Sequence, residues 1–110
     1  MVETIRLGRT EARVSRVSLG TWSHGGPSTA AGRSVGWSGY ERSEALESLI
    51  RAAARGINHW DTADVYGSGR SECLLGEAFA QVNRAEIFLA SKVGYDPGTY
   101  GRPYLSLIHI

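Results

Sequence analysis

Asp61, Tyr66 and Lys92 are the residues of this sequence whose types and spacing suit proton transfer. Lys92 is the only lysine among twelve basic residues, and it ends an apolar segment, residues 87–92 (IFLASK). A tyrosine is a weak proton donor at neutral pH, with an unperturbed pKa of ~10, but a neighbouring ammonium group makes donation easier. A carboxylate such as Asp61 can anchor that ammonium group. These residues suit protonation of a carbonyl oxygen, and because none of them can supply a hydride, a cofactor is implied.

The N-terminal part of the chain is predicted to form a hairpin, a strand and a long loop. Residues 4–7 and 12–14 flank a turn at residues 8–11, which is typical of a β-hairpin. Residues 17–20 predict a buried strand that runs into Thr21 and Trp22. Residues 23–40 are rich in Gly, Ser, Ala and Pro and lack apolar periodicity, so we expect a long loop, of a kind that is usually functional or mobile.

Two helices are then expected to alternate with two strands. The first helix is predicted to start at Ser43 as the N-cap and to stop at Gly56, with a buried face formed by Leu46, Leu49, Ile50 and Ala53. Residues 57–62 predict a strand. The second helix is expected from Ser71 to about Asn83, and a last strand from 86 to 92. The buried face of this second helix is predicted to contain Cys73, Leu74, Leu75, Ala78, Phe79 and Val82.

The spacing of the strand ends indicates the fold class. Asp61 ends one predicted strand and Lys92 ends the next, 31 positions later. An eight-unit (β/α) barrel uses ~30 residues per unit and places its chemistry at the C-terminal ends of its strands. We therefore predict an α/β fold, the N-terminal part of a (β/α)8 TIM barrel, in which a β-hairpin is followed by a βαβαβ order. Trp22, Asp61 and Lys92 would share one edge of its parallel sheet.

Composition excludes several classes of function. A net charge of +1 gives no electrostatic argument for nucleic acid or an anionic membrane as a partner. The single cysteine allows no internal disulfide, which favours a reducing compartment. The N-terminus lacks the apolar segment of a secretory signal, and no apolar run approaches the ~18 residues of a membrane helix. We expect a cytoplasmic protein without a metal site.

Four short motifs give the chain a resemblance to a known family. In order along the sequence they are residues 19–22 (LGTW), 56–63 (GINHWDTA), 66–72 (YGSGRSE) and 91–94 (SKVG). With these motifs the chain resembles the N-terminal part of an aldo-keto reductase, from about Ile5 to Tyr104. The motifs are specific because they occur in the right order and at the right intervals.

The resemblance implies an NADPH-dependent oxidoreductase that reduces a small aldehyde or ketone to an alcohol. Tyr66 would be the general acid, Lys92 would make its hydroxyl more acidic, and Asp61 would hold Lys92. The cofactor's nicotinamide and ribose would lie near Asp61 and the first-strand loop, at Gly20, Thr21 and Trp22.

Each of these roles has a structural alternative. Asp61 could cap a turn, and Tyr66 or Trp22 could be packed aromatic residues. Lys92 could be a solvated charge at the strand end, although the apolar segment before it makes this the weaker interpretation. The same barrel could also be a non-catalytic, nucleotide-sensing regulatory subunit like a channel β-subunit, because that class keeps these residues. The segment 67–72 (GSGRSE) lacks the third glycine of a dinucleotide loop, so a Rossmann fold is rejected.

Three polar residues near the motifs are given other roles. His59 is interpreted as a core residue and Asp64 as structural. His24 could either meet substrate or face solvent.

The C-terminus departs from the family pattern. His109 follows Lys92 by 17 residues, whereas a further βα unit needs ~30, so it is not the histidine that ends the family's fourth strand. The codons CTG TCT CTT ATA CAC ATC, a transposon-end sequencing adapter, would encode residues 105–110 (LSLIHI). We expect a partial NADP-dependent aldo-keto reductase domain over 1–104 and a non-native tail over 105–110. By itself the 110-residue chain is expected to be inactive.

Overall fold

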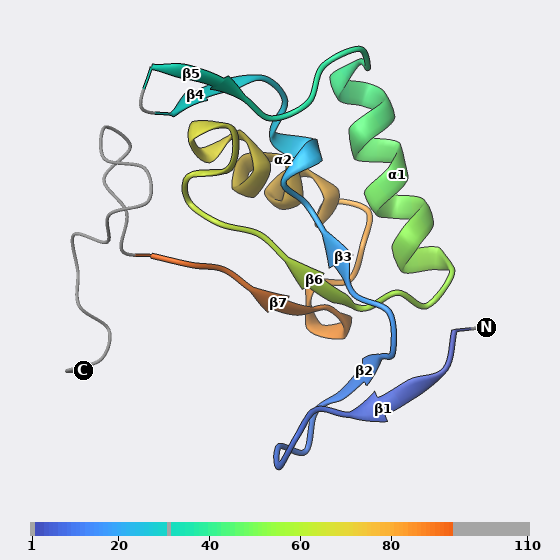
Figure 1. Ribbon diagram of the computed structural model, residues 1–110. Coiled ribbons are helices and arrows are strands. Elements are labelled where there is room, and N and C mark those ends of the chain that lie inside the picture. The colour runs from blue at the N-terminus through green and yellow to red at the C-terminus, as the bar shows by residue number, and fades with distance from the viewer. Residues whose placement is uncertain (1, 31, 94–110) are drawn as a thin grey trace, which may run out of the picture.

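The computed structural model describes residues 2–30 and 32–93 and contains short strands, two α-helices and three 3-10 helices (Figure 1). In chain order the elements are β1 (Thr4–Arg6), β2 (Arg13–Ser15), β3 (Leu19–Gly20), η1 (Ser23–Gly25), β4 (Ser28–Ala30), β5 (Arg33–Val35), α1 (Arg42–Ala54), β6 (His59–Asp61), η2 (Tyr66–Gly69), α2 (Arg70–Ala78), η3 (Arg84–Glu86) and β7 (Phe88–Ala90). The proposed tail at 105–110 and His109 lie outside the described residues. In the part of the chain that the structure describes, no helix has the length and apolar character needed to cross a membrane.

A parallel sheet with the strand order β3-β6-β7 forms the centre of the molecule. Gly20 pairs with Asp61 and Asp61 pairs with Ala90, so the C-terminal ends of the three strands meet at one edge. Helix α1 lies in the connection from β3 to β6, and α2 in the connection from β6 to β7 (Figure 1). The predicted βαβαβ order is therefore confirmed, and so is the N-terminal hairpin, in which β1 pairs antiparallel with β2.

The apolar core lies between this sheet and the two helices. Its buried members come from α1, β6, α2 and the residue just before β7: Ala45, Leu49, Trp60, Leu74, Leu75, Ala78 and Ile87. Trp60 is completely buried, stacks on Phe79 with ring centroids 5.8 Å apart, and donates its indole N–H to the carbonyl of Ile57 at 2.8 Å. The largest side chain of the core is thus packed without leaving its polar atom unpaired.

Helix α1 starts two residues earlier than Ser43 would require. Glu41 is the N-cap, and its backbone N–H donates to the Glu44 carboxylate at 2.7 Å, which forms a capping box. The Ser43 cap is therefore wrong, because this pair of glutamates already satisfies the first turn. The C-terminal stop is as expected, since Gly56 follows the helix with a φ of +87°.

Helix α2 is shorter than the sequence pattern indicates. It ends at Ala78, and Asn83 instead caps η3 by accepting a hydrogen bond from the Ala85 N–H at 3.2 Å. Cys73 is exposed, which corrects its placement on the buried face. The buried face of the helix is formed by Ser71, Leu74, Leu75 and Ala78, and Cys73 falls outside it.

Residues 23–40 are more ordered than an irregular loop. They contain η1 and a second hairpin, in which β4 and β5 pair antiparallel with Ser28 opposite Val35. This hairpin lies above α2 in Figure 1. Arg70, the first residue of α2, donates its Nε–H to the carbonyl of Gly25 at 2.9 Å and a second N–H to the carbonyl of Pro27. The expectation of a long loop without strands or helices is wrong, and the Arg70 side chain of α2 helps to hold the segment in place.

Candidate active site

Lys92 is the centre of the polar cluster at the C-terminal edge of the sheet. Its ammonium group donates to Asp61 Oδ2 at 2.7 Å, to the carbonyl oxygen of Thr62 at 2.9 Å and to the hydroxyl oxygen of Tyr66 at 3.3 Å. An ammonium group has three N–H donors, and here each has an acceptor. The structure therefore brings together the three residues that the sequence singled out.

The strand register explains why these side chains meet. Asp61 ends β6 opposite Ala90 of β7, and the Thr62 N–H donates to the Ala90 carbonyl at 2.9 Å. Because β6 and β7 are parallel, the segments that follow them leave the sheet at the same edge. Lys92, two residues beyond β7, then reaches back to the end of β6.

The charge on Lys92 is favoured by its neighbours. Partial burial by itself lowers the pKa of Lys92, but the hydrogen bonds to Asp61 and Tyr66 and the charges of these two groups raise it, and the net shift is upward from 10.5. The side chains of Lys92 and Asp61 remain 45% and 39% exposed. An ion pair this exposed contributes ~0–1 kcal/mol to stability, so its main consequence is the fixed position of the ammonium group.

Tyr66 begins a tight turn that glycine makes possible. Gly67 has a φ of +60°, and a Cβ atom placed on it would lie 2.1 Å from the carbonyl oxygen of Gly25. A Cβ on Gly25 would likewise lie 2.8 Å from the backbone nitrogen of Gly67. Since the backbones of η1 and η2 touch here, any side chain at either position would displace the turn that carries Tyr66.

A buried chain of hydroxyl groups lies below the cluster. The Ser71 Oγ is 2.9 Å from both Thr21 Oγ1 and Thr62 Oγ1, and it donates to the Thr21 carbonyl at 3.0 Å. Thr21 in turn donates to the carbonyl of Asp61 at 2.9 Å. All three side chains are almost completely buried. They tie α2 to the ends of β3 and β6, a role that local sequence patterns do not reveal although Thr62 and Ser71 lie in two of the motifs.

Aromatic rings cover one side of Tyr66. Trp22 stacks on Tyr66 with centroids 6.1 Å apart and an interplanar angle of 27°. Trp37 meets Trp22 edge-on, at 4.7 Å and 83°. Trp22 is 38% exposed, so it is not a simple core residue. The place of Trp37 could not be predicted from the sequence, because this residue lies in the Gly- and Ser-rich segment, where no periodicity indicates which residues are near others.

The residues expected near a nicotinamide differ in whether they are accessible to a ligand. Gly20 is exposed, and a Cβ atom there would meet nothing within 4 Å, which leaves room for a ligand beside Asp61. Trp22 presents an exposed ring at the same edge. Thr21 is fully buried, and its hydroxyl, N–H and carbonyl all bond within the protein. Gly20, Trp22 and Asp61 therefore fit a cofactor ring, whereas Thr21 supports them from below.

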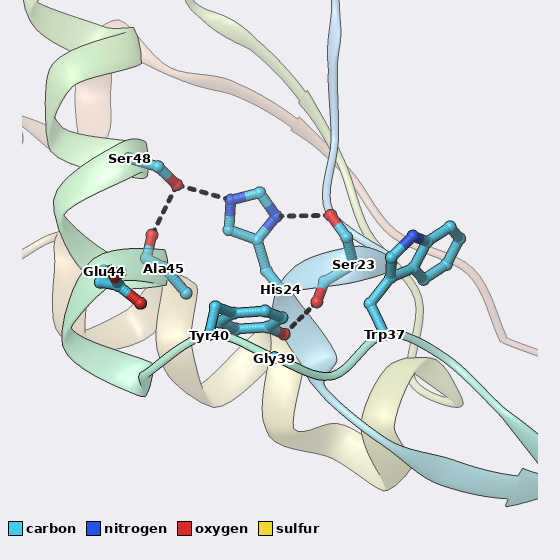
Figure 2. Close-up of a pocket in the computed structure, with 8 residues that line it drawn as sticks. All are labelled: Ser23, His24, Trp37, Gly39, Tyr40, Glu44, Ala45 and Ser48. Carbon is cyan, nitrogen blue, oxygen red and sulfur yellow. Dashed lines mark hydrogen bonds between the residues drawn. The ribbon is translucent and has the colours of Figure 1, made fainter.

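His24 points toward α1, where it meets Ser48 (Figure 2). Its Nε2 is 2.8 Å from Ser48 Oγ, whose own proton goes to the Ala45 carbonyl at 2.7 Å, so His24 donates and Ser48 accepts. The ring borders an open pocket of about 430 Å³ between η1 and the first turns of α1, which contains none of Asp61, Tyr66 and Lys92. Burial lowers the pKa of His24.

Two further polar residues lie close to the strand end. His59 is half-buried and packs edge-on against Phe88, with centroids 5.4 Å apart. It is not among the residues of the buried core, so its interpretation as a core residue is not confirmed. Asp64 follows β6, and its Oδ1 is buried with no hydrogen-bond partner among the described residues. A structural role for Asp64 stays a prediction.

Comparison with known proteins supplies the family. The model of the aldo/keto reductase family matches residues 16–104. The chain belongs to the aldo/keto reductase family. Proteins of this family are oxidoreductases that generally use a nicotinamide cofactor.

Individual relatives support the same assignment. The chain is 33% identical to the NADH-specific methylglyoxal reductase of Escherichia coli over 94 residues, which are 84% of the chain and 27% of that protein. It is 34% identical to a putative voltage-gated potassium channel subunit beta of Schizosaccharomyces pombe over 95 residues, 84% of the chain and 25% of that protein. The chain thus spans about a quarter of the length of these curated relatives.

A solved structure confirms the fold. The chain matches the crystal structure of the thermostable aldo-keto reductase Tm1743, determined with the inhibitor epalrestat, with a TM-score of 0.66 and 35% sequence identity. The match covers 84% of the chain and 31% of that protein. The structural neighbours are TIM barrels, and the βαβαβ unit of this aldo/keto reductase corresponds to the N-terminal part of the barrel.

Proposed function

We propose that this aldo/keto reductase reduces the carbonyl group of a small aldehyde or ketone to an alcohol, with Tyr66 as the proton donor. The observation that carries this proposal is the direction of the hydrogen bond between Lys92 and Tyr66. Because Lys92 can only donate, the Tyr66 oxygen must accept, and the phenolic proton remains available to a second group. That second group would be the carbonyl oxygen of the substrate.

Asp61, Tyr66 and Lys92 would then have different roles in proton transfer. Tyr66 gives its proton to the carbonyl oxygen as the carbon is reduced, and the phenolate that remains is stabilised by the ammonium group of Lys92. Asp61 and the Thr62 carbonyl keep Lys92 in place while this charge develops. A reduced nicotinamide, held beside Gly20, Trp22 and Asp61, would supply the hydride when bound.

We assign NADPH as the cofactor on the resemblance of the motifs alone. The E. coli relative carries the name of an NADH-specific enzyme, so both cofactors belong in the test. A cytoplasmic location completes the proposal, since it would keep the single exposed cysteine reduced.

The second candidate is a non-catalytic, nucleotide-sensing subunit of the same fold. The similarity to a putative channel β-subunit favours it, because that protein shares 34% identity with the chain. The residues of the cluster serve both candidates equally well. Turnover separates the two: a sensor binds the cofactor tightly and leaves it unreacted.

The test is a coupled measurement of binding and turnover on the product of the complete source gene. NADPH and NADH oxidation is followed by absorbance with propanal and an aromatic aldehyde as substrates, and cofactor binding is followed by calorimetry. Aldehyde-dependent oxidation of the cofactor with formation of the alcohol supports the reductase. Tight cofactor binding without oxidation in the presence of any aldehyde would support the sensor instead.

A further inference from the structure

Ser71, the second residue of α2, lies in the middle of the buried hydroxyl chain. A hydroxyl group has one proton to donate. Thr21 gives its hydroxyl proton to the Asp61 carbonyl, and Ser71 gives its own to the Thr21 carbonyl. The proton between Ser71 and Thr62, whose hydroxyl oxygens are 2.9 Å apart, therefore comes from Thr62. The hydrogen bonds thus run in one direction, from Thr62 through Ser71 to Thr21.

This chain of hydroxyl groups fixes the residues that anchor Lys92. Asp61 holds the ammonium group with its carboxylate, and Thr62 holds it with its carbonyl oxygen. At the same time the Asp61 carbonyl accepts hydrogen bonds from the hydroxyl and the N–H of Thr21, at 2.9 and 3.0 Å. The Thr62 side chain is bound by Ser71. Removal of the Ser71 hydroxyl would therefore allow the backbone at both anchors of Lys92 to move.

Glu72, the next residue of α2, contacts the segment that carries Lys92. Its carboxylate accepts a hydrogen bond from the Ser91 hydroxyl at 2.6 Å. Ser91 follows β7 and directly precedes Lys92. The first turn of α2 thus holds the end of β6 through Ser71 and the segment after β7 through Glu72. The hydrogen bonds of Lys92 connect these same two segments.

The contact between Lys92 and Tyr66 is sensitive to small movements. Its length of 3.3 Å exceeds the ~2.9–3.0 Å that is typical of N–H···O hydrogen bonds. A further displacement of ~0.5 Å would break it, and misplacement of a reacting group by ~1 Å can lower a rate by about 100-fold. Residues that fix the position of Lys92 would therefore influence the rate of proton transfer.

We propose that Ser71 and Glu72 are positioning residues for the proton transfer at Tyr66. This inference rests on the proposed reductase function. Ser71 acts through the buried hydroxyl chain, and Glu72 acts through its hydrogen bond to the segment after β7. Together they keep the ammonium group of Lys92 within hydrogen-bond distance of the phenol oxygen, where it stabilises the phenolate as the substrate takes the proton. Their effect therefore falls on kcat.

The experiment is a double-mutant cycle on the product of the complete source gene. With NADPH and propanal, kcat and KM are measured for the wild type, Ser71→Ala, Glu72→Ala and Glu72→Gln, and for both alanine variants combined with Lys92→Ala. We expect Ser71→Ala and Glu72→Ala to lower kcat by about 10-fold and about 3-fold, with KM changed by less than about 2-fold. Glu72→Gln keeps an oxygen acceptor for Ser91 and should recover most of the loss.

The Lys92→Ala background distinguishes positioning from a general loss of stability. Without the ammonium group nothing is left to position, so Ser71→Ala and Glu72→Ala should each lower kcat there by less than about 1.5-fold. Two controls complete the set: Ile87→Val weakens the apolar core, and Glu77→Ala removes another carboxylate of α2. Neither control should change kcat. All assays are run at a temperature at which circular dichroism shows the variants to be folded.

The outcomes separate this inference from the function on which it rests. Losses of the same size with and without Lys92 would show that Ser71 and Glu72 only support the fold, and the inference would be wrong while the reductase function stands. Unchanged kcat in both alanine variants would overturn it as well. If Ser71→Ala does not fold, the Glu72 variants give the same comparison and decide. If the wild type oxidises neither NADPH nor NADH with any aldehyde, the proposed function fails and the inference fails with it.

Discussion

The ammonium nitrogen of Lys92 lies 3.3 Å from the hydroxyl oxygen of Tyr66 and donates a hydrogen bond to it. Lys92 also lies 5.0 Å from the centre of the Tyr66 ring, so its charge is close to the whole phenol. Its other two N–H groups are bound by Asp61 and the Thr62 carbonyl. This geometry leaves the proton of Tyr66 directed away from Lys92 and available to a ligand.

The first prediction concerns the charge of Lys92. Lys92→Ala should lower kcat about 100-fold at neutral pH, because the phenolate that forms at Tyr66 loses its counter-charge. Added ethylammonium salt should restore part of the activity by occupying the vacated position. Salts of tetramethylammonium, which cannot donate a hydrogen bond, are the control. Activity unchanged by the substitution would contradict the role of Lys92.

The second prediction compares two glycines of the turn after Tyr66. Gly67 and Gly69 both have positive φ values, but a Cβ atom meets the Gly25 carbonyl at 2.1 Å only at Gly67. Gly69→Ala should cost about 1–2 kcal/mol for its backbone conformation. Gly67→Ala should cost clearly more and should also lower kcat, because the turn that carries Tyr66 must move. Urea unfolding and turnover measure the two effects, and equal losses in both variants would contradict the account.

The third prediction concerns the buried hydroxyl chain. Ser71→Ala should lower the free energy of unfolding by about 1–3 kcal/mol, because it leaves the buried hydroxyl of Thr62 without a partner. Ser43→Ala, on the exposed side of α1, is the matched control and should stay within about 0.5 kcal/mol of the wild type. Urea unfolding of the three proteins gives the comparison. A Ser71→Ala variant as stable as the control would show that the hydrogen bonds among these buried hydroxyl groups contribute nothing to stability.

The fourth prediction is a pH dependence of stability caused by His24. Burial lowers the pKa of His24 below its ordinary value of 6.5, so as the pH falls through 6.5 the unfolded state takes up the proton first. Stability should therefore decrease as the pH falls from about 7 toward the folded pKa, and level off below it. His24→Gln should remove this part of the slope. Thermal unfolding between pH 5 and pH 7.5 tests it, and identical slopes in both proteins would contradict it.

Lys92 gives the opposite dependence, at alkaline pH. Its pKa is raised in the folded protein from 10.5, so its contribution to stability is present below that pH and is lost as the pH rises through the folded value. Because the side chain is nearly half exposed, the effect on stability is small. The more useful consequence is that Lys92 remains charged over the whole range in which turnover is measured.

Much of this architecture could be predicted from local patterns. Asp61 and Lys92 were placed at the ends of adjacent parallel strands from apolar runs and a spacing of one βα unit, and the strand register agrees. The buried positions Leu49, Leu74 and Leu75 followed from helical periodicity. These features depend on residues that are close in the sequence, so the pattern of a single sequence is enough to predict them.

Other features depend on contacts between residues distant in sequence, and these could not be predicted. The hairpin β4–β5 has no alternating pattern of its own, and Arg70, more than forty positions away, holds the loop beside it. Trp37 is positioned by the approach of Gly36 to Gly26 and by its contact with Trp22. No local periodicity encodes these contacts, so the place of Trp37 beside Trp22 could not be predicted from the sequence.

The most direct test of the central claim is the turnover of Tyr66→Phe. The substitution removes the phenolic O–H and keeps the ring that stacks on Trp22. We expect kcat for aldehyde reduction to fall by about 10²- to 10⁴-fold, while the calorimetric dissociation constant for NADPH changes less than about 3-fold. A Tyr66→Phe variant that reduces aldehydes at the wild-type rate would show that another group supplies the proton, and the account of this site would be wrong.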